Sequence, residues 1–442
     1  MAYCKVFFLL FIINCCLFVA AGFESSDIRN YLGTRTPYRF VANKDDSPFN
    51  FPGCIDTKIW MIIRHGTRLP KTKDVLRRST VLKDLKYEVL RQHKFGKGQL
   101  SPEQLRNLDA WEYDDIDPDR AYDLTREGED EMILMAENMQ KRFPNAIKDK
   151  YDNKTFKFRY TATQRAQQSA RHFALGLFDK KGSQDVVYDP VLKIDPVLRF
   201  YKYCDKWKKQ IEKNPETYEQ WNKFVRSQEM NDTLSAISKK LGLDHVLPLK
   251  TAILMYKECG YGTAWYKHRL SPWCAAFDES TIKPLEYAGD LKQYWVKSYA
   301  YKLSYKQACV TVKHMFNIFV NKTNPKATFL FSHSGTMLKL LTHLQLYKPK
   351  EDLKWDTKPE DRTWKCSKID SFANNLAFVL YKCLDGDYIL TLHKERPIIL
   401  PNCDKELCPL ETVLKTYHSS IYDCDFNDLC RLNKVKTKDN EV

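Results

Sequence analysis

Three short segments of the chain have the hydrophobic pattern of buried β-strands. Residues 59–63 form a continuous apolar run, which suits a strand buried on both faces, and residues 156–160 and 328–331 also read as strands. Each segment leads into a short polar motif. After two of these motifs, apolar residues recur at helical spacing, over 166–177 and 337–344. The order of strand, motif and helix predicts an α/β fold, with a sheet flanked by helices.

The three polar motifs come directly after the predicted strands. Residues 64–70 read Arg-His-Gly-Thr-Arg-Leu-Pro, residues 163–165 read Thr-Gln-Arg, and residues 332–336 read Ser-His-Ser-Gly-Thr. Ligands of α/β sheets bind beyond the carboxyl ends of the strands. We therefore expect the three motifs to face one crevice.

The first motif combines a nucleophile with two guanidinium groups. A neutral imidazole at His65 can attack phosphorus and carry the phosphoryl group, which divides one difficult displacement into two easier steps. Arg64 and Arg68 can clamp the equatorial phosphate oxygens with paired hydrogen bonds and offset their charge. Gly66 would let the backbone approach the phosphate closely. This arrangement indicates phosphoryl transfer through a phosphohistidine.

The motif at 64–70 matches the Arg-His-Gly-x-Arg-x-Pro signature of the histidine acid phosphatases, within the histidine phosphatase superfamily. Residues 124–128 and 165–170 resemble further segments of that family. Residues 371–381 resemble a late strand of the multiple inositol polyphosphate phosphatases, the branch that this chain resembles most. The resemblance runs from about Cys54 to the last cysteines. It implies a histidine-phosphatase-like sheet flanked by helices.

The resemblance also implies a role for each motif residue. His65 would be the nucleophile. Arg64, Arg68 and Arg165 would hold the phosphate, and His333 would donate a further hydrogen bond to a phosphate oxygen. The implied activity is hydrolysis of phosphomonoesters, above all inositol polyphosphates. It needs no cofactor and no metal ion, because arginines supply the positive charge that magnesium supplies elsewhere.

The chain departs from the family pattern at the proton donor. Family members carry an acidic residue one or two positions after the second histidine, where this chain has Ser334 and Gly335. Losing a positioned acid typically costs about 10²–10⁴ in rate, and an inositol alkoxide is a poor leaving group that needs a proton. We therefore expect slow hydrolysis of inositol polyphosphates and faster cleavage of aryl phosphates. We also expect Gly335→Glu to restore the slow reaction.

Residues 187–305 have a different pattern from the rest of the chain. Segments such as 206–227 and 231–241 carry helix-forming residues with apolar positions at helical intervals, and Trp and Tyr are frequent. We interpret 187–305 as a mainly helical insertion domain that covers the crevice. Residues 23–186 and 306–442 would form the α/β core.

The first 22 residues read as a signal peptide. Lys5 precedes a nearly continuous apolar run over 6–19, and small residues at 20–22 offer a cleavage site. No later stretch is apolar enough to cross a bilayer. Sequons for N-glycosylation begin at Asn153, Asn231 and Asn321. These features predict a glycoprotein that is secreted or resides in the lumen of the secretory pathway.

Cysteine usage fits an oxidising compartment. Of the 14 cysteines, three lie in the leader, and the eleven others favour disulfides over a zinc site. Two pairs are close in sequence and are plausible bridges, Cys403 with Cys408 and Cys424 with Cys430. The odd number leaves at least one free thiol or an intermolecular bond.

The formal net charge of +15 attracts anions, which could be nucleic acid, an acidic membrane or a small charged substrate. No nucleic-acid-binding motif is present, and the motifs favour a small anionic phosphate ester. A second hypothesis stays open, a secreted protein that binds inositol phosphates or other polyanions without turnover. A phosphoglycerate mutase-like enzyme would share the Arg-His-Gly core, but the leader and cysteines argue against it.

Overall fold

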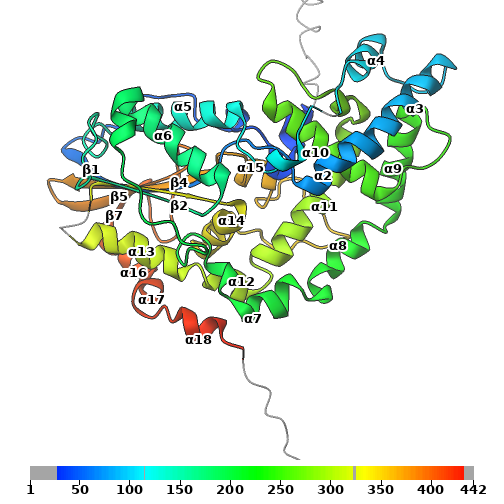
Figure 1. The fold of residues 1–442 in the computed structure, drawn as a ribbon. Helices are drawn as coiled ribbons and strands as arrows, with labels where there is room; N and C mark the ends of the chain where they lie inside the picture. The colour runs from blue at the N-terminus through cyan, green and yellow to red at the C-terminus, as the bar shows by residue number, and fades with distance from the viewer. Residues whose placement is uncertain (1–26, 114, 322–324, 433–442) are drawn as a thin grey trace, which may run out of the picture.

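The computed structural model describes residues 27–113, 115–321 and 325–432. A seven-stranded sheet with the order β2-β3-β1-β4-β5-β6 forms one half of the molecule, and β7 pairs with β5 (Figure 1). The strands are β1 (Cys54–Arg64), β2 (Phe156–Tyr160), β3 (Ala327–Ser332), β4 (Asn375–Cys383), β5 (Gly386–His393), β6 (Arg396–Pro397) and β7 (Leu407–Pro409). The three predicted strands are therefore confirmed as β1, β2 and β3.

The three predicted strands lie side by side and run in the same direction. β1 pairs with β3 so that Arg64 lies opposite Ser332, and β2 pairs with β3 so that Tyr160 lies opposite Phe331. Their carboxyl ends therefore finish at one edge of the sheet. β4 runs antiparallel to β1 and is antiparallel to β5 as well.

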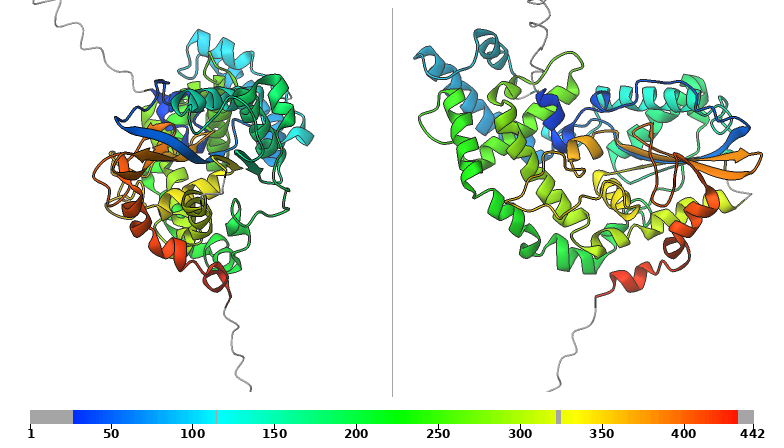
Figure 2. Two further views of the ribbon diagram at one scale, coloured as in Figure 1. Left: turned by 90° about the vertical axis from the view of Figure 1, so that its left-hand side faces the viewer. Right: turned by 180° about the vertical axis from the view of Figure 1, so that it is seen from behind.

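Alternating residues of β1 pack on two layers of helices. Ile59, Met61 and Ile63 belong to a hydrophobic cluster on one face of the sheet, and Trp60 and Ile62 belong to a cluster on the other. Both faces are thus covered, as the apolar run predicts. Figure 2 shows the two layers edge-on. The first layer is α5 (Arg126–Arg142) and α6 (Gln164–Gly182), and the second includes α13 (Cys309–Val320), α14 (Ser334–His343), α16 (Leu410–Thr416) and α17 (His418–Tyr422).

The other half of the molecule is helical and has its own hydrophobic cluster. This cluster joins Leu85 and Leu108, which precede residue 187, to Ile237, Met255 and Leu291, which follow it. Helices from two separate stretches of the chain therefore pack together there (Figure 1). They are α2 (Thr72–Arg77), α3 (Lys83–Lys94), α4 (Pro102–Asp109), α8 (Glu219–Phe224), α9 (Gln228–Leu241), α10 (Leu249–Trp265) and α11 (Glu279–Lys297).

Shorter helices connect the two halves. Residues 206–227 form several short pieces rather than one helix, and one of them begins at Pro215, which lacks the N–H that a continuous helix would use. The remaining short α-helices are α7 (Asp205–Trp207), α12 (Lys302–Lys306), α15 (Cys366–Ile369) and α18 (Phe426–Cys430). Within the three described ranges, no helix has the length and apolar composition that crossing a bilayer would require.

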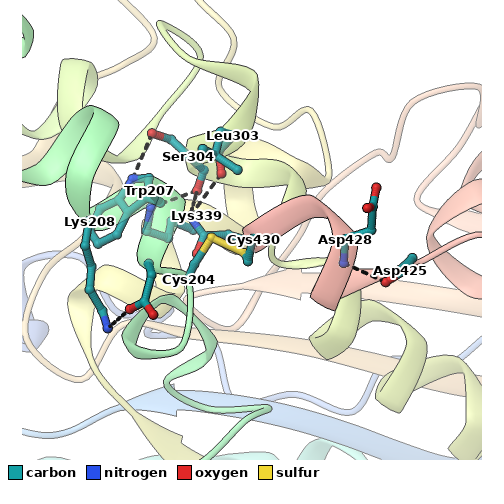
Figure 3. The surroundings of a disulfide bond; sticks show 11 residues. Cys204, Trp207, Lys208, Leu303, Ser304, Lys339, Asp425, Asp428 and Cys430 are labelled. Atoms are coloured by element: carbon teal, nitrogen blue, oxygen red, sulfur yellow. Dashed lines mark hydrogen bonds and ion pairs between the residues drawn. A yellow bond between two sulfur atoms is a disulfide. The ribbon is translucent and has the colours of Figure 1, made fainter. Parts of the chain in front are cut away.

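The disulfide prediction is confirmed for one close pair and wrong for the other. Cys403 bonds with Cys408, but Cys424 bonds with Cys309 on α13 and Cys430 bonds with Cys204 (Figure 3). Tertiary packing determines these pairings, because the chain around α17 and α18 places Cys424 against α13 and Cys430 beside Cys204, which precedes α7. Two further bonds join Cys54 to Cys383 and Cys259 to Cys274. Cys366 is a buried free thiol, as the odd number of cysteines requires.

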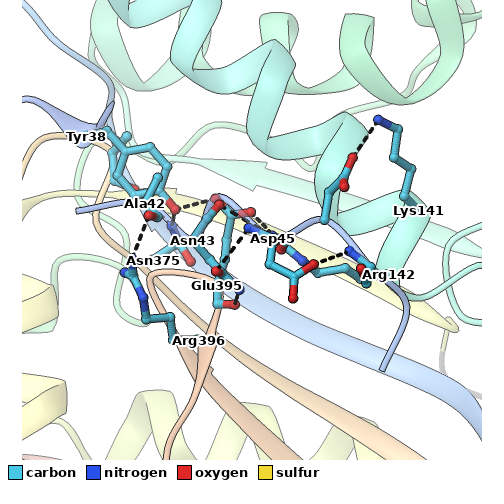
Figure 4. Close-up of polar contacts among 12 residues, drawn as sticks. Tyr38, Ala42, Asn43, Asp45, Lys141, Arg142, Asn375, Glu395 and Arg396 are labelled. Carbon is cyan, nitrogen blue, oxygen red and sulfur yellow. Dashed lines mark hydrogen bonds and ion pairs between the residues drawn. The ribbon is translucent and has the colours of Figure 1, made fainter. Parts of the chain in front are cut away.

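A buried polar network fixes the N-terminal segment over the sheet (Figure 4). Glu395 accepts hydrogen bonds from Tyr38 and from Arg142 on α5. Asn375 at the start of β4 donates to the hydroxyl of Tyr38 over 2.8 Å. The carbonyl of the neighbouring Asn374 accepts from the backbone N–H of Arg64. The network therefore anchors β4 where it meets the end of β1.

The features predicted near the termini and on the surface can be placed only in part. The leader over 1–22 lies outside the described residues, as do two positions of the sequon that begins at Asn321. Asn153, Asn231 and Asn321 are all exposed.

Candidate active site

The structure brings the three predicted motifs to one edge of the sheet. His65 follows β1, and its backbone N–H donates to the carbonyl of Ser332 over 3.1 Å. Arg165 lies in the first turn of α6, just after β2, and His333 immediately precedes α14. The charges of Arg64, Arg68 and Arg165 all act on the imidazole of His65.

His65 is held as a neutral imidazole with one nitrogen available. The residue is 4% exposed, and its Nδ1 lies 2.9 Å from the carbonyl oxygen of Gly66. Because a carbonyl oxygen only accepts, Nδ1 carries the proton and the lone pair lies on Nε2. Burial and the charges of Arg165 and Arg64 lower the pKa of His65 well below its ordinary value. A neutral imidazole with a free Nε2 lone pair can act as a nucleophile.

His333 stands beside His65, with the ring centroids 5.5 Å apart and the planes inclined at 62°. The hydroxyl oxygen of Thr161, just after β2, lies 2.9 Å from Nε2 of His333. Burial, followed by the charges of Arg165 and Arg199, lowers the pKa of His333 well below its ordinary value. His333 is therefore neutral as well. With Nε2 engaged by Thr161, Nδ1 is the ring nitrogen that can contact a ligand.

Four arginines near these histidines each have a buried Nε without a partner, a feature that Arg39 and Arg142 share elsewhere in the described chain. The four are Arg64, Arg68, Arg165 and Arg199. Burial and the charges of Arg68 and Arg199 lower the pKa of Arg165 to about 10. Among the described residues only Arg64 of these four has a carboxylate within 4 Å, that of Asp370, so the cluster carries a net positive charge that attracts an anion.

Aromatic rings cover parts of these guanidinium groups. The ring of Tyr122 lies 5.3 Å from the guanidinium carbon of Arg68 and 5.5 Å from that of Arg165. The ring of Phe372 lies 4.9 Å from the guanidinium carbon of Arg64. Cation–π contacts orient a guanidinium group without cancelling its charge. Backbone carbonyls engage one Nη of two of these arginines, since Arg64 donates to Asp370 and Ser371 and Arg68 donates to Leu69. Their other guanidinium nitrogens are left for an anionic ligand.

The sequence pattern gives no sign of Arg199 or Tyr201. Arg199 immediately precedes a short 3-10 helix (Phe200–Lys202) that contains Tyr201. The hydroxyls of Ser332 and Thr336 hold this segment in place by donating to the carbonyl of Leu198, over 2.7 and 2.6 Å. Tyr201 forms side-chain hydrogen bonds with Arg199 and Thr336. Only tertiary contacts bring these two residues beside the predicted motifs.

Tyr201 occupies the space next to Gly335. A Cβ atom built on Gly335 would lie 3.3 Å from Cζ and 3.4 Å from Oη of Tyr201, and the tyrosine itself is only 9% exposed. A larger side chain would press on a ring that is already packed. Restoration of a proton donor by Gly335→Glu stays a prediction, and it requires the ring of Tyr201 to move by a few tenths of an ångström.

Asp370 is a buried carboxylate at the edge of the arginine cluster. Its Oδ1 lies 3.4 Å from Nη1 of Arg64, and Ser334 donates its hydroxyl to Oδ2. Burial raises the pKa of Asp370, while Arg64 opposes that shift. Asp370 lies in the loop between α15 and β4, directly before the recognised segment 371–381, and no sequence pattern gives it a role.

The loop after β1 is fixed from behind by α5. The backbone N–H and the hydroxyl of Thr67 donate to Glu131 over 2.7 and 2.9 Å. A Cβ on Gly66 would lie 2.5 Å from the carbonyl oxygen of Gly128, which is on α5. The missing side chain of Gly66 therefore makes room for α5, and its predicted close approach to a phosphate stays a prediction.

Two helices begin at the site without a side-chain cap. Neither Thr163, before α6, nor His333, before α14, caps its helix with a side-chain hydrogen bond. Their first backbone N–H groups and the positive ends of their dipoles favour a bound anion. Over residues 27–113, 115–321 and 325–432, no group of three or more His, Cys, Asp or Glu side chains is arranged to hold a metal ion. The arrangement combines an anion cradle with a nucleophile.

Known proteins with similar sequences carry phosphatase names. The family model of the histidine phosphatase superfamily (branch 2) matches residues 57–395. The chain is 32% identical to multiple inositol polyphosphate phosphatase 1 of Drosophila melanogaster, over 90% of this chain and 87% of that protein. It is 24% identical to the Homo sapiens protein of the same name, over 95% of this chain and 92% of that one.

Solved structures share the fold. The phytase from D. castellii aligns with a TM-score of 0.73 at 16% identity, over 92% of this chain and 88% of that one. The Bifidobacterium longum multiple inositol polyphosphate phosphatase, in complex with phosphate, aligns with a TM-score of 0.68 at 14% identity, over 89% and 98% of the two chains. Because the family model spans most of the sequence, the chain is a member of the histidine phosphatase superfamily (branch 2) and thereby a phosphoric monoester hydrolase.

Proposed function

We propose that this enzyme hydrolyses inositol polyphosphates through a phosphohistidine formed on Nε2 of His65. The observation that carries the proposal is the hydrogen bond from Nδ1 of His65 to Gly66, which places the lone pair on Nε2 beside the arginine cluster. Arg64, Arg68 and Arg165 would hold the transferring phosphate, and His333 would donate to one of its oxygens.

The reaction takes two displacements. In the first, Nε2 of His65 attacks phosphorus while the ester oxygen departs, and the arginines neutralise charge on the equatorial oxygens. In the second, water attacks phosphorus and frees His65. Positions 334 and 335 carry no carboxyl group, so the proton for the leaving inositol alkoxide has to originate from an acid elsewhere in the chain, and we expect departure of that alkoxide to be slow.

A multiply phosphorylated substrate fits the charge of the chain. Arg199 adds a fourth guanidinium group to the three predicted from the sequence, and the net charge is +15. The curated relatives are named for inositol polyphosphates, and the B. longum enzyme has been solved with inositol hexasulfate. We therefore favour inositol polyphosphates over esters that carry a single phosphate.

We further propose that the protein is a glycoprotein of the secretory pathway or the extracellular space. The predicted leader over 1–22, the exposed asparagines of the three sequons and the five disulfides among the described residues support this location. Residues 187–305 would act as the insertion that covers the site.

The test is phosphate release from inositol hexakisphosphate by the wild type beside His65→Ala. His245→Ala, which removes an exposed histidine of the helical half, is the matched control. We expect release by the wild type and the control, and loss of at least 10³-fold in His65→Ala. Binding of inositol hexakisphosphate without release by the wild type, weakened in Arg68→Ala, would instead show a non-catalytic binder.

A further inference from the structure

The chemistry of the site needs a proton that its histidines cannot supply. Both His65 and His333 are neutral, and the N–H of a neutral imidazole is a very weak acid. The ring proton of His65 is also bonded to the carbonyl of Gly66, and that of His333 would hold a phosphate oxygen. An alkoxide leaving group needs a proton as the bond to phosphorus breaks. The described residues offer two carboxyl groups that bond to members of the site. Asp370 contacts Arg64 and Ser334, and Glu131 contacts Thr67.

Asp370 lies between Arg64 and the first residue of α14, and Glu131 supports the loop after β1 from α5. Asp370 is fully buried, with Arg64 on one carboxylate oxygen and the hydroxyl of Ser334 on the other. Ser334 is the first residue of α14, directly after His333. Its hydroxyl therefore lies between a carboxyl group and the helix terminus that faces the phosphate. Glu131 is occupied by the donors of Thr67 and by the backbone N–H of Tyr38.

We propose that Asp370 and Ser334 form a proton relay that protonates the leaving group and later deprotonates the attacking water. Ser334 is the group that touches the reacting oxygen, and Asp370 acts through it. This inference rests on the proposed phosphohistidine mechanism and supplies its missing proton donor.

The relay balances over the two steps. The first step starts from Asp370 as the carboxylic acid, whose O–H donates to the Ser334 oxygen, while the Ser334 hydroxyl, which donates to Asp370 in the structure, has turned to the ester oxygen. The bond between phosphorus and the ester oxygen then breaks, that oxygen takes the proton of the Ser334 hydroxyl, and Ser334 takes the proton of the Asp370 carboxyl. Phosphorus is then bonded to Nε2 of His65, and Asp370 is a carboxylate. In the second step water attacks phosphorus, its proton returns through Ser334 to Asp370, and the P–N pair of electrons returns to His65.

The surroundings of Asp370 suit a group that cycles between these two states. Burial raises the pKa of Asp370, which favours the protonated form, while the facing charges of Arg64 and Lys297 favour the carboxylate. An incoming phosphate would offset the charge of Arg64 and so promote protonation just when the donor is needed. Departure of the product would reverse this effect.

The experiment compares Asp370→Asn and Ser334→Ala on two ester classes. For inositol hexakisphosphate we expect kcat/KM to fall about 10²-fold or more in both variants, the usual loss for a removed acid. For p-nitrophenyl phosphate, whose phenolate leaves without a proton, we expect kcat/KM to change less than about threefold, because this ratio reports the first displacement. A burst of p-nitrophenolate should persist while steady-state turnover falls, since the relay also serves hydrolysis of the phosphohistidine.

Two controls make the outcome decisive. Glu258→Gln removes a buried carboxylate from a pair with Arg78 (3.0 Å) in the helical half and should leave both ester activities unchanged. Tyr201→Phe tests the phenol beside Gly335 as a rival donor. Three results would each overturn the relay. They are an equal loss of kcat/KM on both esters in Asp370→Asn, little loss on the inositol ester in Ser334→Ala, and a loss confined to the inositol ester in Tyr201→Phe. A wild type inactive on both esters would instead refute the proposed function.

Discussion

Arg199 and Arg165 lie close enough that the charge of Arg199 helps to lower the pKa of Arg165 to about 10. Arg165 lies in the first turn of α6. Arg199 precedes the 3-10 helix Phe200–Lys202, next to Leu198, whose carbonyl accepts a hydrogen bond from Thr336 of α14. The charges of two neighbouring guanidinium groups repel each other, and an anion that binds between them or beside them reduces this repulsion. A substrate with several phosphates can contact both groups at once.

We therefore expect Arg199→Ala to discriminate between substrates. A charge-assisted hydrogen bond is worth about 1.5–3 kcal/mol, so KM for inositol hexakisphosphate should rise about tenfold or more. KM for p-nitrophenyl phosphate, which carries one phosphate, should change much less. Phosphate-release kinetics on both esters would measure this, with the exposed Arg226→Ala as control. Equal changes of KM on the two esters would contradict an added role of Arg199 in binding polyphosphates.

The acidic limb of the pH–rate profile should lie below the range of an ordinary histidine. Burial and the neighbouring arginines lower the pKa of His65, so the reactive neutral imidazole persists as the pH falls below about 6.5. We expect kcat/KM for an aryl phosphate to remain high at pH values where a free imidazole would be protonated. The profile from about pH 4 to 8 would show it, after correction for ionisation of the substrate. If the acidic limb of kcat/KM had its midpoint near pH 6.5 and this limb arose from His65, the pKa of His65 would not be lowered by burial and the arginines.

Tyr201 should determine whether position 335 accepts a side chain. Gly335→Glu places new atoms against a packed ring, and overpacking of this kind typically costs about 1–3 kcal/mol. In a Tyr201→Ala background the same substitution should cost much less, because the ring is gone. Denaturant unfolding of the wild type, both single variants and the double variant gives the interaction free energy between positions 201 and 335. Strictly additive losses would show that Tyr201 does not limit the space at Gly335.

The strand-end motifs could be predicted because their pattern is local. The apolar run before His65 and the alternation before Arg165 each identify a strand from neighbouring residues alone, and parallel pairing then fixes where the strands end. Gly66 shows the limit of this approach. The close approach of Gly128 on α5 to this residue became clear only from the tertiary packing.

Asp370, Arg199 and Tyr201 could not be predicted because no pattern gives them a role, although Asp370 directly precedes the recognised segment 371–381. Asp370 and Arg199 lie at the ends of short helices and Tyr201 within one, and each reaches the site through contacts with residues far along the chain. The partners of Cys424 and Cys430 were missed for the same reason, since sequence proximity suggested a bond that helix packing does not permit. Local patterns therefore locate the nucleophile and its nearest arginines, and tertiary packing supplies the rest of the site.

Glu131, behind the catalytic loop, should make stability depend on pH. Burial raises the pKa of Glu131 to about 7 against the opposing hydrogen bonds from Thr67, while in the unfolded chain it is near 4.5. Between these values the folded chain holds a proton that the unfolded chain has lost. The stabilising contribution is therefore present below pH 4.5 and is lost as the pH rises through 7, with a full change of about 3 kcal/mol.

Glu131→Gln should remove this dependence, because an amide does not titrate. The free energy of unfolding of the wild type, relative to that of Glu131→Gln, should decrease as the pH rises from about 5 to 8. Glu137→Gln, at an exposed position of the same helix α5, should show no such trend. Urea unfolding at fixed salt over this range isolates the effect, since other titrating groups are common to all three proteins. Parallel stability curves for the wild type and Glu131→Gln would mean that Glu131 is ionised throughout and that the donors of Thr67 outweigh its burial.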